Sequence, residues 1–410
     1  MTFFRLLILL GLFVVASVAS GGVLPGWRVE TIAAVESGKF ATSVVVDSRG
    51  TLYYTTTDGG VFRVDQAGST LIKQLPTTAE GNTGLLGMAL VDDRTAVVHY
   101  TNVPVTRHVL STIDLGTGQE RILALLVCDI GMPERPAPVE HHGGNPTVAP
   151  DGSIYFGIGD FGGGVIASLP EWNAGKIFRV TPDGLVTQFA RGLRNPYDLA
   201  WDPELGRLFV GDNGALGGDE IHLVAEGDYC GWPFTYGNLP AIDGAVVPEY
   251  VFPETTAPTG VLRLSGANSY LRRGYLVGGF MNSSLSYFPD ATRPAPWPDP
   301  LKLIDGGFGN VIDVAEGRDG ALFVTTGVAV KRLLPPRRGD CNGDGLVDVQ
   351  DVLALQRELS DGEHQPMTSA QDGAFAGSWG CDANADGVVS YEDTSVLARS
   401  IGRHRAVGRR

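Results

Sequence analysis

The sequence has 410 residues, of which 19% are charged, and a formal net charge of −15 at pH 7. This acidic balance argues against nucleic acid and anionic membrane surfaces as partners. The length allows one large and one small domain, and the 56 glycines and 25 prolines, together with many valines and aromatic residues, favour β-structure.

The N-terminal segment carries a basic residue, Arg5, and then an apolar run from Leu6 to Val18 that is followed by small residues. This order predicts a secretory signal peptide over residues 1–20, cleaved after Ser20. The run is shorter than the ~20 residues that a membrane helix needs. We therefore expect an exported, extracellular or periplasmic protein without a membrane span.

Residues 22–334 repeat one pattern, in which an alternating apolar run, a turn and a second β-rich run follow one another. The copies lie near Ser43, Leu85, Glu140, Asn195, Gly260 and Val311. A recurrence of roughly 45 to 65 residues with several strands per unit is typical of propeller blades. The sequence therefore predicts an all-β fold, a six-bladed β-propeller, with a large β-sandwich as the alternative.

The third copy contains an Asp-Gly turn, Asp151-Gly152, between two β-rich runs, which is a strong hairpin signal. His141 precedes the first strand of this hairpin and Asp160 follows the second, so antiparallel pairing would bring both to one rim. A carboxylate beside an imidazole fixes its tautomer and raises its basicity. This predicts a general base; the plainer alternative is that His141 and His142 are only polar surface residues.

Three motifs carry a family resemblance. His-x-Gly-Gly from His141, followed by Pro-Asp-Gly-x-Ile-Tyr and Gly-Asp, resembles the soluble glucose and sorbosone dehydrogenases, six-bladed propellers that use pyrroloquinoline quinone (PQQ). The resemblance implies that His141 takes a sugar hydroxyl proton and that Asp160 holds the imidazole. The Gly-x-Arg-Asn-Pro motif implies that Arg194 and Asn195 contact the quinone, and a Gly-Leu-Leu-Gly stretch implies the same for Asn82.

The resemblance also places a calcium ion and the carboxylates of PQQ. Backbone carbonyls at Gly214 and Ala215 would hold the calcium that bridges to the cofactor. Three cationic positions of the family, which would bind the carboxylates, are occupied here by Met281, Asn310 and Ile312. Because each lost cation removes a charge-assisted contact, we expect weaker PQQ binding than in typical members. Arg272, Arg273 or Lys302, from neighbouring loops, could bind the carboxylates in place of the lost cations.

After a linker at residues 335–339, two acidic loops have the ligand spacing of calcium sites, with a glycine at the sixth position. Each precedes a short amphipathic helix, expected at residues 352–359 and 394–401. The expected ligands are Asp340, Asn342, Asp344, Leu346, Asp348 and Asp351 in the first loop, and Asp382, Asn384, Asp386, Val388, Ser390 and Asp393 in the second. Residues 340–402 resemble a type I dockerin, which implies a cohesin-bearing partner. A frayed basic tail is expected at 403–410.

The four cysteines fall into two groups, Cys128 with Cys230 and Cys341 with Cys381. In an oxidising compartment an even count favours pairing within each group, most readily between the two that bracket the small module.

These features predict a secreted PQQ-dependent aldose dehydrogenase tethered through a dockerin. A non-catalytic propeller that binds carbohydrate or protein is the main alternative. A glycan hydrolase is a third, which no carboxylate pair supports.

Overall fold

The computed structural model describes residues 22–24, 26–66, 68–129, 137–268, 270–271, 273–289, 292–361, 379–384, 386 and 388–407, with only the backbone at 361 and 402–407. The signal peptide expected at 1–20 lies outside these residues. Within them, no helix combines the length and apolarity that crossing a membrane requires.

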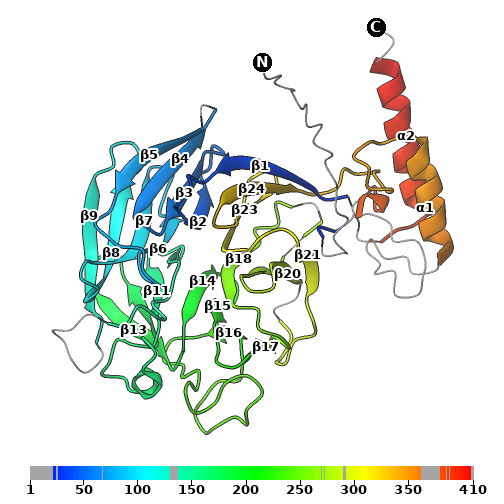
Figure 1. Ribbon diagram of the computed structural model, residues 1–410. Coiled ribbons are helices and arrows are strands. Elements are labelled where there is room, and N and C mark those ends of the chain that lie inside the picture. Colours follow the sequence, from blue (N-terminus) through cyan, green and yellow to red (C-terminus); the bar gives the residue numbers. More distant parts are fainter. Residues whose placement is uncertain are drawn as a thin grey trace, which may run out of the picture.

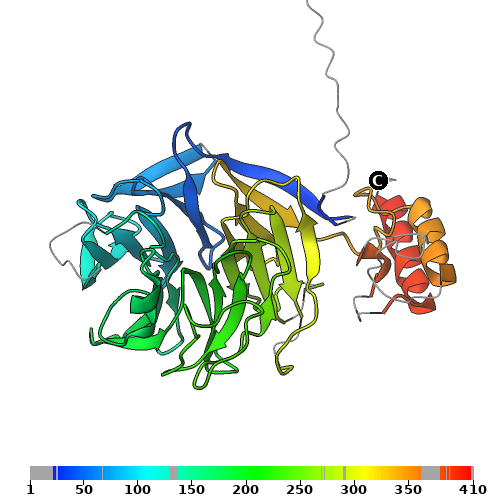
Figure 2. The same cartoon turned by 60° about the horizontal axis from the view of Figure 1, so that its bottom comes forward.

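The strands form six antiparallel four-stranded sheets arranged around one axis, which confirms the six-bladed β-propeller (Figures 1 and 2). Blade 1 contains β2 (Ala41–Val46), β3 (Leu52–Thr56), β4 (Gly60–Asp65) and β5 (Gly68–Gln74). Blade 2 contains β6 (Leu85–Leu90), β7 (Thr95–Thr101), β8 (Arg107–Asp114) and β9 (Glu120–Val127). Blade 3 contains β10 (Thr147–Val148), β11 (Ile154–Ile158), β12 (Lys176–Val180) and β13 (Val186–Arg191), with the 3-10 helix η1 (Gly164–Ser168) between β11 and β12.

The remaining blades follow the same order. Blade 4 contains β14 (Pro196–Asp202), β15 (Arg207–Asp212), β16 (Glu220–Val224) and β17 (Tyr250–Val251). Blade 5 contains β18 (Pro258–Arg263), β19 (Tyr275–Gly279), β20 (Ser284–Phe288) and β21 (Leu301–Asp305). Blade 6 contains β22 (Asp313–Glu316), β23 (Leu322–Thr325) and β24 (Ala329–Leu334), and its fourth strand is β1 (Arg28–Ala34) from the beginning of the chain.

The ring closes through β1. This strand pairs antiparallel with β24, from Arg28 opposite Leu334 to Ala34 opposite Ala329. The last blade is thereby assembled from both ends of the propeller segment, with β22 as its innermost strand and β1 as its outermost strand, so that β1 covers the edge of β24. The repeat pattern had indicated six units but not this closure.

Aromatic side chains fill the space between neighbouring blades. Tyr155 of blade 3 stacks on Trp201 of blade 4 with ring centroids 5.1 Å apart, and Phe209 of blade 4 stacks on Tyr275 of blade 5 at 3.9 Å. Strand side chains alternate between the two faces of a sheet, so each blade presents one apolar face to each neighbour. This alternation explains why the aromatic β-runs recur along the sequence.

The terminal module consists of two helices, α1 (Val349–Asp361) and α2 (Tyr391–Val407), with the short 3-10 helix η2 (Trp379–Cys381) between them. The expected helices lie within these bounds. The prediction of a frayed tail was wrong for residues 403–407, because their backbone continues α2. The module lies beside the propeller (Figure 2), and Trp379 packs edge-on against Trp27, with ring centroids 5.8 Å apart.

The cysteines behave differently in the two domains. Cys341 and Cys381 form a disulfide, as expected. Cys128 and Cys230 are both free and buried, so the pairing expected between them was wrong. Cys128 follows β9 of blade 2, whereas Cys230 follows β16 of blade 4, and the blades hold the two thiols apart.

Candidate active site

His141 and Asp160 meet as the hairpin predicted. The β10–β11 pairing sets Thr147 opposite Tyr155, which brings the two flanking loops to one end of blade 3. His141 Nδ1 lies 2.6 Å from an Asp160 carboxylate oxygen, and its backbone has a left-handed φ of 50°. The His141 backbone N–H donates to the Asn82 side-chain oxygen at 3.1 Å. The other ring nitrogen, Nε2, has no hydrogen bond among the described residues and is available to a ligand.

Asp160 is 1% exposed in its side chain and is held from several sides. The Trp232 indole N–H donates to it at 2.8 Å, and the backbone N–H groups of Gly162 and Gly164 donate at 2.8 and 3.1 Å. Burial alone would raise the pKa of Asp160, but the hydrogen bonds from His141, Gly162 and Trp232 outweigh it and lower the pKa below its ordinary value. The carboxylate therefore stays ionised and orients the imidazole.

Trp232 was not predicted as a site residue, although it lies in a Gly-Trp-Pro turn that follows the Arg194 motif along the sequence. The tryptophan ring also lies 5.7 Å from the Arg194 guanidinium carbon, so it connects the histidine motif with the arginine motif.

The two glycines after the histidines permit a close backbone approach. A Cβ on Gly143 would lie 2.1 Å from the Gly157 carbonyl oxygen, and a Cβ on Gly144 would lie 1.9 Å from that of Tyr197. Any side chain at either position would push the loop away from blades 3 and 4. The Gly-Gly pair therefore seats the loop that carries His141.

Asp212 shapes the loop that carries Arg194 and Asn195. Its two carboxylate oxygens accept the backbone N–H groups of Arg194 at 2.9 Å and Asn195 at 2.7 Å. Burial raises the pKa of Asp212 to about 6, although these two hydrogen bonds oppose the shift. The buried Asn195 side-chain oxygen accepts the Gly143 backbone N–H at 2.9 Å, so the two motifs are joined directly.

The Arg194 guanidinium contacts backbone carbonyls. Its Nη1 donates to the Asn213 and Gly214 oxygens at 2.8 and 3.1 Å. The Ala215 carbonyl accepts the Gly218 N–H at 2.9 Å. Each of the two carbonyls expected to hold calcium thus accepts one hydrogen bond and keeps a second lone pair. Calcium binding at Gly214 and Ala215 stays a prediction.

Next to these motifs a cavity of about 390 Å³ opens at the starts of the inner strands. Its volume lies within the range of small-molecule pockets. It is lined by Phe40, Thr42, Thr57, Ala79, Gly81, Asn82, Thr83, Leu85, Leu86, Asn195, Tyr197, Asn213, Ala257, Thr259, Phe280 and Ile312. Of the candidate residues, Asn82 and Asn195 line this cavity. His141 donates a hydrogen bond to the lining residue Asn82, and Arg194 donates one to the lining residue Asn213.

None of the described residues that line the cavity is charged. Ile312, at one expected cationic position, does face it, whereas Met281 is 61% exposed. Of the substitute cations, Arg273 pairs with Glu204, and Lys302 pairs with Asp305 and Glu254. Arg272 lies outside the described residues. The donors that suit quinone oxygens are thus present, but none of the described residues that line the cavity supplies a cation for a PQQ carboxylate.

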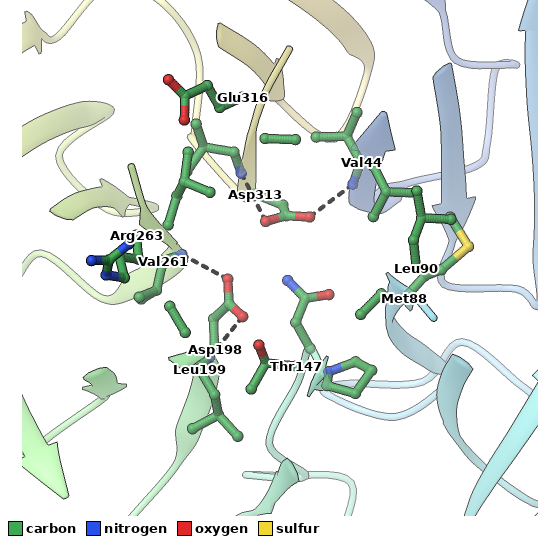
Figure 3. Close-up of a pocket in the computed structure, with 18 of the residues that line it drawn as sticks. Val44, Met88, Leu90, Thr147, Asp198, Leu199, Val261, Arg263, Asp313 and Glu316 are labelled. Atoms are coloured by element: carbon green, nitrogen blue, oxygen red, sulfur yellow. Dashed lines mark hydrogen bonds between the residues drawn. The ribbon is translucent and has the colours of Figure 1, made fainter. Parts of the chain in front are cut away.

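Further along the inner strands lies a second cavity of about 310 Å³, bordered by all six blades. Figure 3 shows Asp198 of β14 and Asp313 of β22 pointing into it. Their oxygens accept backbone N–H groups of the next blades: Val261 donates to Asp198 at 2.6 Å, and Val44 donates to Asp313 at 2.8 Å. Burial raises the pKa of Asp313 to about 7 and also raises that of Asp198. Each of these carboxyl groups therefore joins its own blade to the next one by a hydrogen bond.

The acidic loops of the terminal module have the internal hydrogen bonds of calcium loops. In the first, Asp351 accepts the N–H groups of Asn342 at 3.1 Å and Asp348 at 2.7 Å. In the second, Asp393 accepts those of Asn384 at 3.0 Å and Ser390 at 2.8 Å. Burial raises the pKa of Asp340 and of Asp351, as neighbouring carboxylates also do. Clustered carboxylates of this kind suit a calcium ion, and calcium binding by these two loops stays a prediction.

Comparisons with known proteins agree with this geometry. Residues 39–334 match the family described as Glucose / Sorbosone dehydrogenase, and residues 338–402 match the Dockerin type I domain. Aldose sugar dehydrogenase YliI of Escherichia coli is 24% identical over 333 residues, which cover 72% of this chain and 88% of that protein. Quinoprotein glucose dehydrogenase B of Acinetobacter calcoaceticus is 29% identical over 133 residues, 25% of this chain and 28% of the relative.

An uncharacterized protein of Synechocystis is 28% identical over 144 residues, which cover 29% of this chain and 35% of the relative. The chain thus spans about a third of the length of the Synechocystis and Acinetobacter relatives. Among solved structures, the PQQ-bound aldose sugar dehydrogenase of Streptomyces coelicolor is similar in fold, with a TM-score of 0.62, 24% identity and coverage of 75% of this chain and 98% of that chain. The apo-form of the E. coli soluble aldose sugar dehydrogenase has a TM-score of 0.65 at 17% identity, covering 76% and 100%. The chain belongs to the glucose/sorbosone dehydrogenase family and carries a C-terminal type I dockerin domain.

Proposed function

We propose that the propeller oxidises a hydroxyl group of an aldose sugar and that His141 is the general base. The observation that carries this proposal is the His141–Asp160–Trp232 arrangement, which a hydrogen bond from His141 joins to Asn82 in the lining of the 390 Å³ cavity. Asp160 holds the proton on Nδ1, which leaves the lone pair of Nε2 directed away from the carboxylate. Nε2 takes the hydroxyl proton, and the buried carboxylate stabilises the imidazolium that results.

PQQ is the proposed electron acceptor, and when bound it would take up the hydride from the sugar carbon. Asn82, Arg194 and Asn195 would hold it through neutral or guanidinium donors, with Arg194 polarising a quinone oxygen. Calcium at the Gly214 and Ala215 carbonyls belongs to the same proposal. The neutral lining of the cavity predicts weak capture, because three lost charge-assisted contacts at about 1.5–3 kcal/mol each lower affinity by several orders of magnitude.

The same neutral cavity favours the second candidate, a propeller that binds carbohydrate or protein without catalysis. Its amide and hydroxyl groups suit a neutral sugar as well as they suit a cofactor. The two functions differ in what they require of His141. Catalysis needs its free ring nitrogen, whereas binding alone does not.

The dockerin domain supports a tethered role. Dockerins pair with cohesins, so we propose that this chain is displayed outside the cell on a cohesin-bearing protein. Tyr391, the first residue of α2, is 78% exposed, and Val349, the first residue of α1, is 57% exposed. These two residues are therefore accessible to such a partner.

Reconstitution of the full chain with PQQ and calcium tests the enzymatic proposal. We expect oxidation of at least one aldose in a panel with an artificial electron acceptor, and loss of turnover in His141→Ala. Asp151→Asn, at the exposed turn of the same hairpin, is the matched control and should keep full activity. Absence of PQQ binding at high micromolar concentration would favour the non-catalytic propeller. Nanomolar binding would contradict the assignment of neutral residues to the carboxylate positions.

A further inference from the structure

Three buried histidines form a continuous chain next to the active-site loop. His99 lies on β7, His108 lies on β8, and His142 follows the proposed base directly in sequence. All three have 0% exposure, and the free thiol of Cys128 lies beside them at 1% exposure. One ring atom each of His108 and His142 and the Cys128 sulfur lie within 4.8 Å of one another.

The contacts along the chain run from one backbone carbonyl to another. His99 Nδ1 lies 2.8 Å from the Gly144 oxygen, and His99 Nε2 lies 2.8 Å from His108 Nδ1. His108 Nε2 then lies 3.2 Å from His142 Nδ1, and His142 Nε2 lies 2.7 Å from the Pro138 oxygen. Every ring nitrogen of the three imidazoles is therefore engaged in one of these four contacts.

Three neutral imidazole rings carry too few protons to form all four hydrogen bonds of this histidine chain. A carbonyl oxygen only accepts, so His99 must carry its proton on Nδ1 and His142 must carry its proton on Nε2. The facing nitrogens, His99 Nε2 and His142 Nδ1, are then both acceptors. His108 lies between two acceptors and would need a proton on each of its nitrogens. Four contacts thus require four protons, whereas three neutral imidazoles supply only three.

A fourth proton would create an imidazolium in apolar surroundings. Phe161 packs on His108 and His142 with ring centroids 5.8 and 5.0 Å away, and Phe156 packs on His99 at 4.9 Å. Burial accordingly lowers the pKa of His99 and of His142 to about 4, and it also lowers that of His108. Without the fourth proton, His108 can donate to only one neighbour. The shorter contact, 2.8 Å to His99 against 3.2 Å to His142, assigns the His108 proton to Nδ1, so the lone pairs of His108 Nε2 and His142 Nδ1 face each other.

A metal ion between these two lone pairs removes the conflict. His108 can then donate from Nδ1 to His99, and His142 can donate from Nε2 to Pro138, so that every proton has an acceptor. Two nitrogens bound at 2.0–2.1 Å with a tetrahedral angle are separated by about 3.3 Å, and this pair is 3.2 Å apart, the longest contact of the chain. Hydrogen bonds from the second ring nitrogens to His99 and a carbonyl are the usual support of metal-binding histidines.

We propose that His108 Nε2, His142 Nδ1 and the thiolate of Cys128 bind one soft or borderline transition-metal ion, copper(I) or zinc(II). The ion displaces the thiol proton to solvent and forms three metal–ligand bonds, with no change of oxidation state. A buried thiolate and two neutral imidazoles give a neutral site with copper(I) and a net charge of +1 with zinc(II), so burial favours copper(I). The ion would fix the loop that carries His141 to blade 2.

Burial raises the pKa of the Cys128 thiol to about 12, while nearby Arg107 opposes the shift. The thiol is therefore protonated when no metal is present. A bound metal ion deprotonates a coordinating thiol, so uptake of the metal should release about one proton per site from this residue.

Metal titration of the full chain tests the proposal. The protein, stripped with a chelator and reloaded with calcium, is titrated with zinc(II), or anaerobically with copper(I) in ascorbate, which leaves disulfides intact. We expect one tightly bound equivalent in the wild type and an affinity at least about a hundredfold lower in Cys128→Ser. Cys230→Ser, at the other buried free cysteine, is the matched control and should bind as the wild type does. Competition between the two metals identifies the preferred ion.

Cobalt(II) gives a second, spectroscopic readout. Thiolate ligation produces a sulfur-to-cobalt charge-transfer band in the near ultraviolet, and we expect this band in the wild type and in Cys230→Ser. Its absence, together with equal uptake of zinc and copper by the wild type and Cys128→Ser, would overturn the proposal. The three histidines would then share a fourth proton, as a buried imidazolium.

Discussion

Asp313→Asn provides the sharpest test of the electrostatics along the propeller axis. The Asp313 carboxyl is buried in the second cavity and faces Asp198 from β14. From β2, the backbone N–H of Val44 donates to it. Asparagine keeps the shape of the side chain but removes the ionisable group. The variant therefore separates the packing role of this residue from the cost of its charge.

The direction of the pKa shift of Asp313 determines whether its carboxyl stabilises the fold at low or at high pH. Burial, and not a favourable partner, raises the pKa of Asp313 from 3.8 to about 7, so the folded state binds the proton more tightly than the unfolded state does. The stabilisation is fully present below the unfolded value of 3.8 and is lost as the pH rises through about 7. A shift of this size corresponds to about 4 kcal/mol in total, of which about 3 kcal/mol is lost between pH 5 and pH 8.

The assay is chemical denaturation of the full chain in saturating calcium, monitored by tryptophan fluorescence. At pH 5 the variant should be less stable than the wild type by about 1–3 kcal/mol, because the asparagine NH₂ group faces a backbone donor. Between pH 5 and pH 8 the difference should move in favour of the variant by about 2–3 kcal/mol. Asp243→Asn, at an exposed aspartate, controls for the loss of one negative charge. An equal loss of stability from pH 5 to pH 8 in wild type and Asp313→Asn would refute the reasoning.

Two further predictions address the cofactor cavity and the terminal module. Ile312→Lys places a cation in the cavity, so we expect PQQ to bind roughly ten- to a hundredfold more tightly in a fluorescence titration, with Ile312→Met as the neutral control; unchanged affinity would show that position 312 does not face the carboxylates. Calcium chelation should abolish the helical circular dichroism of α1 and α2 while the propeller stays folded. The carboxylates clustered in the preceding loops repel one another without calcium, and isolated helices of 13 and 17 residues are marginal in water. Helices that survive excess chelator would contradict this.

The sequence by itself determined the features that depend on local patterns. Alternating apolar runs and Asp-Gly turns predicted six blades, because strand periodicity and turn chemistry are encoded by adjacent residues. The calcium loops and the helices after them were predicted for the same reason, since their ligands lie within twelve positions of one another. The proximity of His141 and Asp160 also followed from local information, because a single hairpin connects them.

Only the tertiary structure decided features that join distant segments. The closure of blade 6 by β1, the indole of Trp232 on Asp160 and the support of the Arg194 loop by Asp212 depend on contacts between different blades or strands. The free state of Cys128 and Cys230 followed from the separation of blades 2 and 4. The histidine chain combines residues from two strands and a loop, and its proton count becomes visible only when both terminal carbonyls are in place. Sequence patterns specify which face of a strand is buried, but the ring closure decides which side chains meet there.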